Sequence, residues 1–577
     1  MIVIFPGLLW KPTPNRNAAK NLSRANPSAA LANQIASLDS RFIRGPLAVK
    51  NIQRTLVLGA SIVALAGCGA DEIVSPGTGG NIIINNPSPS PTPTPTPTGG
   101  ATVTPANGCP TINTPGGLTD AGTISGPTGT YRVCRLPATF TASDTLPYIR
   151  GLLYQVQGRV NVGTDQGFSS TNTAVTLTVE PGVILFAQAE SYLVVNRGNR
   201  ILSNGTAARP IVWTSQDNVL GLASDNSQAQ WGGVVMLGRA PVSDCSTQVF
   251  NTAANPTANA QCEQQLEGTT VATPFGGSNS ADSSGSFTYN QIRYSGFELQ
   301  QSNELQSLTT GGIGSGTTIN HLMSFNSSDD GMEFFGGTVN ARNIAVIGAS
   351  DDSLDVDTGA QANLETVLVV QRGNTGDSLI ELDSPNAAST PIVALPQTRL
   401  QVNNFTFVQR SSSSSQIIRA RGGAALGLTN GVMDKIDGTS TFCVRIDEQE
   451  TLDALISPRS IVCDGGASNG ARGDRSSAAN STTDAEVLAA FPSANNINLA
   501  AALTLTNNVV NGTFENGFTS FDATAAPARS SFFTNQGFVG STQNAAGLTS
   551  VFTNWTCNSS IMDFGSSTGA CTSLPVY

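Results

Sequence analysis

Short strand-like stretches rich in apolar residues dominate the chain from residue 109 onwards. The stretch 174–179 alternates, whereas 183–186, 192–195, 200–202 and 210–214 are short, mainly apolar runs. Turn-forming residues separate them, as Glu180-Pro181-Gly182 does after the first. Strand, turn and strand at this close spacing predict an all-β fold.

A longer repeat appears between residues 320 and 420. An apolar strand-like stretch followed by an Asp-Asp pair occurs in 320–334 and again in 343–356, with the pairs 22 residues apart. A third copy covers 366–382, and a weaker fourth covers 404–419 after an insertion. Periods of this length indicate a solenoid. Three short strands fit in the period, whereas a helix pair does not, so we predict a parallel β-helix with one coil per repeat.

The same patterns divide the chain into regions. We assign 109–470 to the β-helix body with its loop insertions, and 471–577 to a C-terminal segment that packs on this body. Short helices are expected only at 448–456 and 483–491, where Thr482 or Thr483 can cap the second helix. Residues 68–108 form an N-terminal linker, because Pro alternates with Ser or Thr there and keeps the chain extended.

The segment 49–67 has the layout of an export signal. Lys50 and Arg54 precede an apolar run that is too short to span a bilayer and ends in Leu-Ala-Gly before Cys68. This ending resembles the bacterial lipobox, in which the cysteine is lipidated and becomes the mature N-terminus. Residues 1–48 show no such pattern, and we interpret them as an upstream extension from a start site placed too early.

Lipidation of Cys68 would anchor the protein to a membrane. Gly69 follows, whereas an aspartate at that position favours retention in the inner membrane of many Gram-negative bacteria. We therefore expect an outer-membrane lipoprotein, on the periplasmic face or at the cell surface.

The charge balance argues against nucleic acid as a partner. The chain has 29 Lys and Arg residues and 40 Asp and Glu residues. Residues 1–68 hold eight of the basic residues and one of the acidic residues, so the remainder carries a net charge of −18 with Lys435 as its single lysine. Such a surface repels phosphate backbones and suits cations and neutral or cationic ligands.

Eight cysteines follow Cys68 as four local pairs. An exported protein meets an oxidising compartment, which favours disulfides. A zinc site is poorly supported, because the chain has no Cys-x-x-Cys spacing and one histidine. We expect sequential pairing, since each pair flanks one loop: Cys109–Cys134, Cys245–Cys262, Cys443–Cys463 and Cys557–Cys571.

Four motifs occur together along the chain. They are Trp231-Gly232-Gly233 to Ala240-Pro241, Gly311 to Ile319, Asp329 to Asn340, and Phe532 to Gly540 with Asn554-Trp555-Thr556. They resemble a group of bacterial exported right-handed β-helix proteins with a pectin-lyase-like fold, often encoded beside TonB-dependent outer-membrane receptors. The resemblance covers roughly residues 150–577. It implies a right-handed parallel β-helix and a TonB-dependent receptor as a partner.

Carboxylates recur at matching positions of the repeat. Asp329, Asp330 and Glu333 correspond to Asp351, Asp352 and Asp355, beside Asp357, and then to Asp377, Glu381 and Asp383. Coils stack about 4.8 Å apart, so equivalent side chains would form an acidic ladder. Ca²⁺ accepts such clusters of oxygen ligands. We predict a Ca²⁺ site built from Asp330, Glu333, Asp352, Asp355, Asp377 and Glu381, extended by Glu304 one coil earlier. Turn-stabilising aspartates and compensation by Arg342 are the alternatives.

Catalysis is the second interpretation of these carboxylates. The β-helix polygalacturonases cleave glycosidic bonds with several aspartates, but also present Gly-His-Gly and Arg-x-Lys motifs. Here His321 lies in Asn-His-Leu and Lys435 in Asp-Lys-Ile, and neither matches. A lyase with Arg342 or Arg372 as the base beside Ca²⁺ is another alternative, and catalytic residues stay unassigned.

Together these features predict a lipid-anchored extracytoplasmic β-helix that binds a ligand such as a glycan for an outer-membrane uptake system. The alternatives are a polysaccharide-degrading lyase or hydrolase on the same fold, and a structural or adhesive surface lipoprotein.

Overall fold

The computed structural model describes residues 102–577, apart from 270, 301–302, 385–390, 436–440, 467–469, 475–478 and 526–528. For residues 299, 300, 303 and 304 it describes the backbone alone. Residues 1–101, with the predicted export signal and Cys68, lie outside the described residues. Among the helices of the described part, none is long and apolar enough to cross a membrane.

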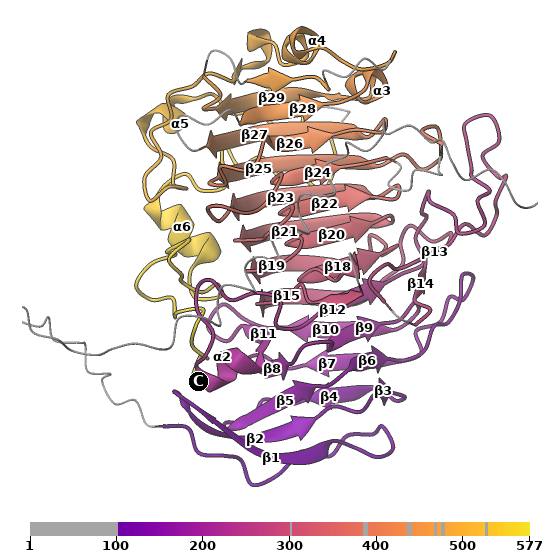
Figure 1. The fold of residues 1–577 in the computed structure, drawn as a ribbon, viewed down its shortest axis with the longest axis vertical. Coiled ribbons are helices and arrows are strands. Elements are labelled where there is room, and N and C mark those ends of the chain that lie inside the picture. The colour runs from indigo at the N-terminus through magenta and orange to yellow at the C-terminus, as the bar shows by residue number, and fades with distance from the viewer. Residues whose placement is uncertain are drawn as a thin grey trace, which may run out of the picture. The chain divides into compact units, whose positions relative to one another are not determined.

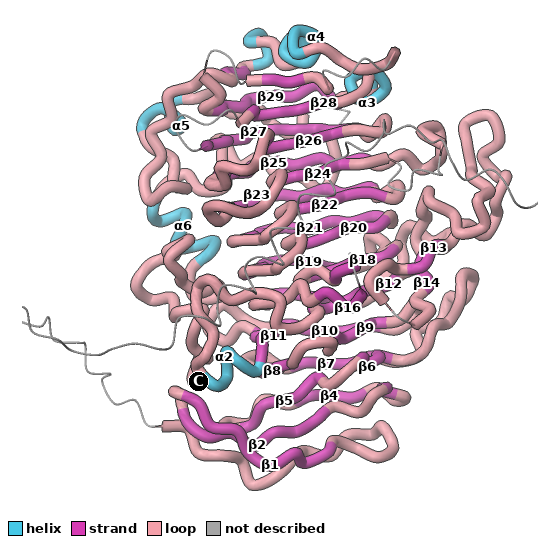
Figure 2. The backbone as a smooth tube through the Cα atoms, in the orientation of Figure 1, coloured by secondary structure: helices cyan, strands magenta, loops and turns pink. Residues whose placement is uncertain are grey.

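The body is a right-handed parallel β-helix whose coils stack into two long sheets (Figure 1). Sheet A has 16 strands and sheet B has 11. Neighbouring strands within both sheets run parallel, except for the antiparallel pair that begins sheet A. Figure 2 shows the stacked strands, with the helices at the periphery of the body.

Sheet A contains β1 (Thr119–Gly126), β2 (Gly129–Arg135), β4 (Asp144–Leu146), β5 (Leu152–Val156), β7 (Thr176–Val179), β8 (Ile184–Ala187), β10 (Arg200–Asn204), β11 (Ile211–Ser215), β15 (Gly285–Arg293), β19 (Thr318–Phe325), β21 (Thr338–Ile347), β23 (Gln361–Val370), β25 (Arg399–Gln409), β27 (Ala425–Lys435), β29 (Ile456–Cys463) and β31 (Ile497–Asn498).

Sheet B contains β3 (Thr139–Phe140), β6 (Arg159–Val162), β9 (Tyr192–Val195), β12 (Gly233–Leu237), β18 (Leu308–Gly311), β20 (Met332–Phe335), β22 (Leu354–Asp357), β24 (Ile380–Leu382), β26 (Gln416–Ala420), β28 (Phe442–Ile446) and β30 (Ala471–Arg472). Two small antiparallel pairs stand apart: β13 (Gln264–Gln265) with β14 (Pro274–Phe275), and β16 (Glu298–Gln300) with β17 (Asn303–Glu304).

The long strands of sheet A each bend at one residue in the left-handed conformation. The bends lie at Tyr289, His321, Asn343, Thr366, Asn404, Asn430 and Ser460, with φ between 51° and 58°. The strand pairing skips these positions in every coil, so they form a column along the body. Asn adopts this conformation at low cost and occupies three of the seven places. Each bend lets one strand supply two sides of a coil, while sheet B supplies the third.

Apolar rows fill the interior of the coils. Leu322, Ile344, Val367 and Phe405 stand in register on successive strands and are almost completely buried. Gly431 continues this row, and a Cβ atom there would meet the Phe405 ring at 2.0 Å. The row therefore stays close-packed because glycine makes room for a phenylalanine of the coil below.

The helices are short and lie outside the two sheets. They are α2 (Gln216–Leu220), α3 (Gln449–Asp453), α4 (Asp484–Ala489), α5 (Thr513–Gly517) and α6 (Ala545–Phe552), with one 3₁₀ turn, η1 (Ser493–Asn495). α3 and α4 confirm the two predicted helices, and Thr483 caps α4 through a capping box. The sequence patterns missed α2, α5 and α6.

The chain after β31 runs back along the outside of the body (Figure 1). The sequence patterns placed the end of the β-helix body at residue 470. The last strands, β30 and β31, lie beyond that residue. Leu548 and Phe552 of α6, followed by Trp555, pack on the outward-facing Phe325 and Ile347 of sheet A. The segment thus covers an apolar face that the coils leave open, and its end reaches Tyr148 near the start of the body.

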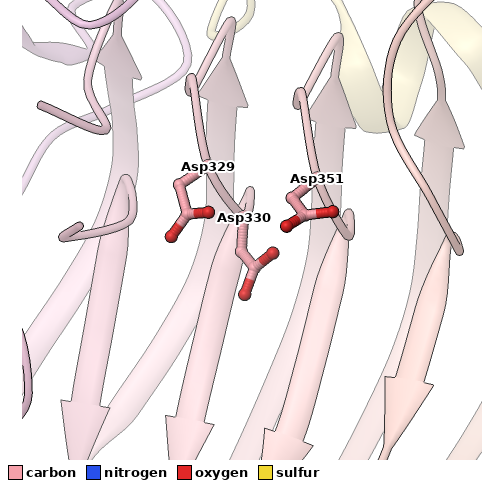
Figure 3. Close-up of side chains that lie close together, drawn as sticks. All are labelled: Asp329, Asp330 and Asp351. Atoms are coloured by element: carbon pink, nitrogen blue, oxygen red, sulfur yellow. The ribbon is translucent and has the colours of Figure 1, made fainter. Parts of the chain in front are cut away.

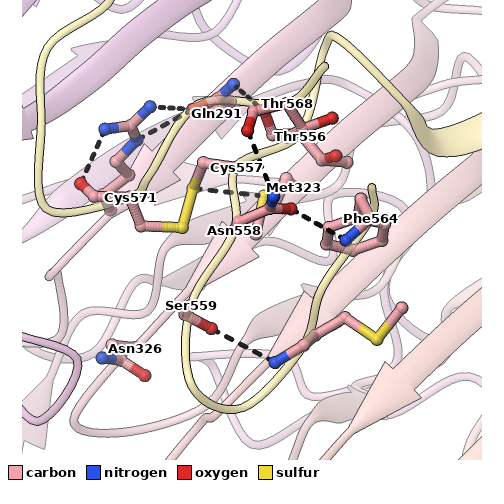
Figure 4. The surroundings of a disulfide bond; sticks show 12 residues. Gln291, Met323, Asn326, Thr556, Cys557, Asn558, Ser559, Phe564, Thr568 and Cys571 are labelled. Carbon is pink, nitrogen blue, oxygen red and sulfur yellow. Dashed lines mark hydrogen bonds between the residues drawn. A yellow bond between two sulfur atoms is a disulfide. The ribbon is translucent and has the colours of Figure 1, made fainter. Parts of the chain in front are cut away.

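All four predicted disulfides are present: Cys109–Cys134, Cys245–Cys262, Cys443–Cys463 and Cys557–Cys571. The first braces the N-terminal end, the second an insertion, and the last the C-terminal segment (Figure 4). These are places where the stacking of coils gives little support, so a covalent link that restricts the unfolded chain stabilises them most.

Candidate functional site

Carboxylates of three successive strands of sheet B stand in register. Glu333 of β20 pairs with Asp355 of β22, which pairs with Glu381 of β24. Their neighbours along each strand belong to the interior core, so these three side chains point to the outer face. We call them the acidic column. Thr309 precedes the column and Arg419 follows it in register.

An insertion between β12 and β15 covers one end of this face. Val242, Leu266 and Phe275 of the insertion form an apolar cluster with the outward-facing Phe335 of β20. The disulfide between Cys245 and Cys262 braces the insertion. This cover explains why Glu333 is only 3% exposed although it points away from the core.

Two aspartates in the loops before the strands also serve the backbone. The amide of Asp352 donates to Asp330 Oδ1 at 2.9 Å, and the amide of Ser378 donates to Asp352 Oδ1 at 2.6 Å. Each carboxylate therefore links its coil to the next. These bonds between coils use one oxygen of each aspartate, and the side chain of Asp352 also contacts Glu381.

Two groups of three carboxylates lie close enough to share a cation. One oxygen from each of Asp330, Glu333 and Asp355 lies within 4.8 Å of the others, and so do oxygens of Asp329, Asp330 and Asp351 (Figure 3). Asp330 belongs to both groups. Glu333 Oε2 and Asp355 Oδ1 are buried and accept no hydrogen bond from the described residues. Buried oxygens of this kind are costly unless a cation or a proton compensates them.

Burial raises the pKa of five carboxyl groups well above their ordinary values: Asp330, Glu333, Asp352, Asp355 and Asp357. Repulsion between neighbouring carboxylates raises each pKa further. Glu267 of the insertion adds to this repulsion at Glu333 and Asp357. The site therefore favours either bound protons or a bound cation.

Guanidinium groups form ion pairs at the far end of the column, and Arg421 also lowers the pKa of Asp355 from a distance. Arg419 Nη1 lies 3.0 Å from Glu381 Oε1, and Arg421 pairs with both Glu381 and Asp383. Burial still raises the pKa of Asp383 to about 6, although Arg421 lowers it. Within the described residues, no Arg or Lys forms an ion pair with Asp330, Glu333 or Asp355. These three carboxylates are the centre of the candidate cation site.

The arginines suggested by the sequence lie elsewhere. Arg342 pairs with Glu365 on sheet A at 2.9 Å and stacks on Phe532, and Arg372 contacts Gln228. Arg342 lies in β21 of sheet A, directly before the bend residue Asn343. It therefore cannot compensate the acidic column, and neither arginine faces it as a catalytic base. Arg419 and Arg421 hold the compensating positions instead.

Glu304 does not extend the column. It lies in β17, within the small pair β16–β17, and Thr309 is the neighbour of Glu333 in the preceding coil. The number of residues between Glu304 and Asp330 is close to one coil length. However, β16 and β17 form a separate pair that adds residues to the chain without adding a strand to either long sheet. Asp377 accepts a hydrogen bond from Gln416 Nε2 at 3.1 Å, in the loop before β24.

The single histidine and the single lysine of the body take no part in this site. His321 occupies a bend of sheet A, where it stacks on Tyr289 with 4.1 Å between ring centroids. Burial lowers the pKa of His321 to about 4, so the imidazole is neutral at physiological pH. Lys435 ends β27, also in sheet A. Sequence patterns missed Glu267, Arg419 and Arg421, because none of them repeats in the Asp-Asp motif.

Without a cation, stability should fall as the pH rises from about 4 towards neutrality. A carboxyl group with a raised pKa binds its proton more tightly in the folded state, so its contribution is full below the unfolded pKa. The contribution disappears as the pH rises through the folded pKa. Denaturant unfolding across this range in cation-free buffer measures the slope, and added Ca²⁺ should flatten it. A stability that increases with pH would contradict this account of the site.

The family of the chain follows from comparison with known proteins. A family model described as a pectate-lyase-like β-helix domain matches residues 153–516, which is more than half of the chain. No curated protein and no solved structure matches the chain. The matched residues include the acidic column and the guanidinium groups beside it. The chain belongs to the pectate-lyase-like β-helix family.

Proposed function

We propose that this protein is an extracytoplasmic β-helix that binds an extended ligand, a glycan, at the outer face of sheet B with a divalent cation. The family supports a polysaccharide-related or surface role in broad terms. The observation that carries the proposal is the group Asp330, Glu333 and Asp355: the three carboxylates are mutually close, two of them are buried, and none forms an ion pair within the described residues.

The donor set suits Ca²⁺. All the candidate ligands are carboxylate oxygens, which hard cations prefer, and no sulfur or imidazole is among them. Ca²⁺ takes six to eight oxygen ligands. Asp330, Glu333 and Asp355 therefore leave positions for oxygens of water or of a sugar. Asp355 and Glu381 are partly exposed, so the open side of the site faces the uncovered part of sheet B.

A polysaccharide-degrading lyase or hydrolase is the second candidate. Carboxyl groups with raised pKa values next to ionised ones are the groups that acid and base catalysis needs. Glycosidic hydrolysis uses two of them. The pKa values of Asp352 and Asp355 are both raised, and Asp355 is partly accessible.

One experiment separates these functions. The purified protein is mixed with a panel of neutral and acidic polysaccharides, with Ca²⁺ or with a chelator. Ca²⁺-dependent binding without shorter or unsaturated products supports the binding function, and such products support the enzyme. A protein that binds none of the panel would instead fit a structural or adhesive role. The Glu333→Gln and Asp355→Asn double variant should lose the Ca²⁺-dependent interaction in either of the first two cases.

Cys68→Ser is expected to release the protein from membranes. The lipobox ending and Gly69 support lipidation and delivery to the outer membrane, where the family resemblance suggests a TonB-dependent receptor as partner. Fractionation of cells that express each form measures the effect, with Cys109→Ser as the control that should keep the anchor. If the Cys68→Ser protein stayed in the membrane fraction, lipid anchoring at this residue would be wrong.

A further inference from the structure

Arg293 is a buried cation with no carboxylate partner in the part of the chain that the structure describes. Two other arginines with almost fully buried side chains pair with acids: Arg197 with Asp165 and Glu263, and Arg239 with Asp282. Arg293 is 2% exposed, and its hydrogen-bond partners within the described residues are neutral. It donates to the carbonyls of Cys571 and Ser573 and to the side chain of Gln291.

Arg293 also lines a cavity of about 450 Å³. The cavity lies between Gln291 and Arg293 of β15 and the end of the C-terminal segment, including Gly569, Ser573 and Tyr577. Figure 4 shows Gln291 and Thr556, both lining residues, beside the disulfide of Cys571. Cavities of this size accommodate a ligand as large as a monosaccharide.

A second arginine without a carboxylate partner stands at the Tyr577 wall. Arg209 stacks over the Tyr148 ring, 3.9 Å from its centroid, and lies 5.7 Å from the Tyr577 centroid. Its Nε and Nη2 atoms are buried and donate no hydrogen bond to the described residues. Both Arg209 and Arg293 lower the pKa of the Tyr577 hydroxyl, although burial raises it more. Two arginines that form no ion pair with the described residues therefore act at this wall.

We propose that this cavity is a binding site for a small organic carboxylate, such as a sugar acid. The guanidinium of Arg293 supplies the charge, and the amide and hydroxyl groups of Asn554, Ser567 and Ser573 surround the rest of the ligand. A monoanion suits the site, because Arg293 is the one arginine among the residues that line the cavity, whereas Arg209 stands behind the Tyr577 wall. The site is separate from sheet B and does not depend on the cation site.

Titration calorimetry of the purified full chain with sodium glucuronate, sodium acetate and glucose tests the proposal. Glucuronate is expected to bind saturably, whether or not acetate also binds. Glucose should bind at least about tenfold more weakly than glucuronate, because it lacks the charge-assisted hydrogen bond. Glucose that binds as well as glucuronate would overturn the proposal, as would absence of binding by both carboxylates.

Two variants place the site. Arg293→Gln removes the charge but also loosens contacts to the C-terminal segment. Gly569→Trp leaves Arg293 intact and fills the cavity, since a Cβ atom at Gly569 meets nothing within 4 Å. Both should weaken glucuronate binding about tenfold or more. The control Arg150→Gln removes an exposed arginine outside this lining and should bind normally. Unchanged affinity in a folded Gly569→Trp protein would overturn the proposal.

Discussion

Replacing Glu333 by glutamine and Asp355 by asparagine together is expected to abolish a Ca²⁺-dependent gain in stability. In the unaltered protein, free Ca²⁺ at one hundred times its dissociation constant should raise the free energy of unfolding by about 2.7 kcal/mol. The gain arises because the cation binds the folded site, where Asp330, Glu333 and Asp355 converge, and not the unfolded chain. Denaturant unfolding with Ca²⁺ and with a chelator measures it.

The choice of Glu333 and Asp355 separates cation binding from turn chemistry. Asp330 and Asp352 accept backbone hydrogen bonds, so their replacement would disturb both functions. Glu333 and Asp355 carry the unpartnered oxygens, and the asparagine that replaces Asp355 keeps a side-chain oxygen that can accept the hydrogen bond from the amide of Val356. In the chelator, the double variant should be at least as stable as the unaltered protein at neutral pH, because two repelling buried charges are gone.

A matched control changes the same charge at the surface. Glu190→Gln with Asp453→Asn removes two exposed carboxylates and should leave the response to Ca²⁺ intact. Equal responses in the double variant and the unaltered protein would show that any cation binds elsewhere. If neither Ca²⁺ nor chelator changed the free energy of unfolding, the carboxylates of the acidic column would be compensated by bound protons alone.

The repeat made most of this fold predictable from the sequence. The period between the Asp-Asp pairs set the coil length, and the correspondence of Glu333, Asp355 and Glu381 then followed from counting residues. The structure places all three in register on sheet B. The cysteines were similarly informative, because each sequential pair closes a short loop that a solenoid must brace.

Residues that enter the site from outside the repeat could not be predicted. Glu267 comes from an insertion whose path over sheet B depends on apolar packing between Phe275 and Phe335. Arg419 stands in the column where an acid would continue the pattern, so similarity between coils hides it. Glu304 shows the opposite error, since its spacing fits one coil while β16 and β17 absorb the residues.

The path of the C-terminal segment also lay beyond the sequence patterns. Residues after β31 have no period of their own, and the outer side chains of sheet A, such as Phe325 and Ile347, indicate only that something must cover them. The bend residues contribute to the docking. Asn404 Nδ2 donates to the carbonyl of Phe538, and Asn430 Nδ2 donates to that of Phe521. Short polar contacts of this kind arise only once the column of bends exists.

Trp555→Ala is expected to release the C-terminal segment and to cost about 3–5 kcal/mol locally. Trp555 is 1% exposed and packs in the cluster that joins α6 to sheet A. This cluster is separate from the interior core of the coils, so its loss should open the segment without unfolding the body. Limited proteolysis should therefore cut the segment near α6 in the variant while the β-helix stays resistant.

Trp213→Ala is the matched comparison, because it removes a tryptophan from inside the coils and not from beneath the C-terminal segment. Trp213 is fully buried in the interior core and donates from Nε1 to Asn290. Its loss removes the same side chain from inside the coils, so it should lower the unfolding midpoint of the whole body without selective cleavage of the C-terminal segment. If Trp555→Ala instead lowered that midpoint with no early cleavage, the segment would be an integral part of the cooperative β-helix. In that case the apolar face of sheet A and its cover would fold as one unit.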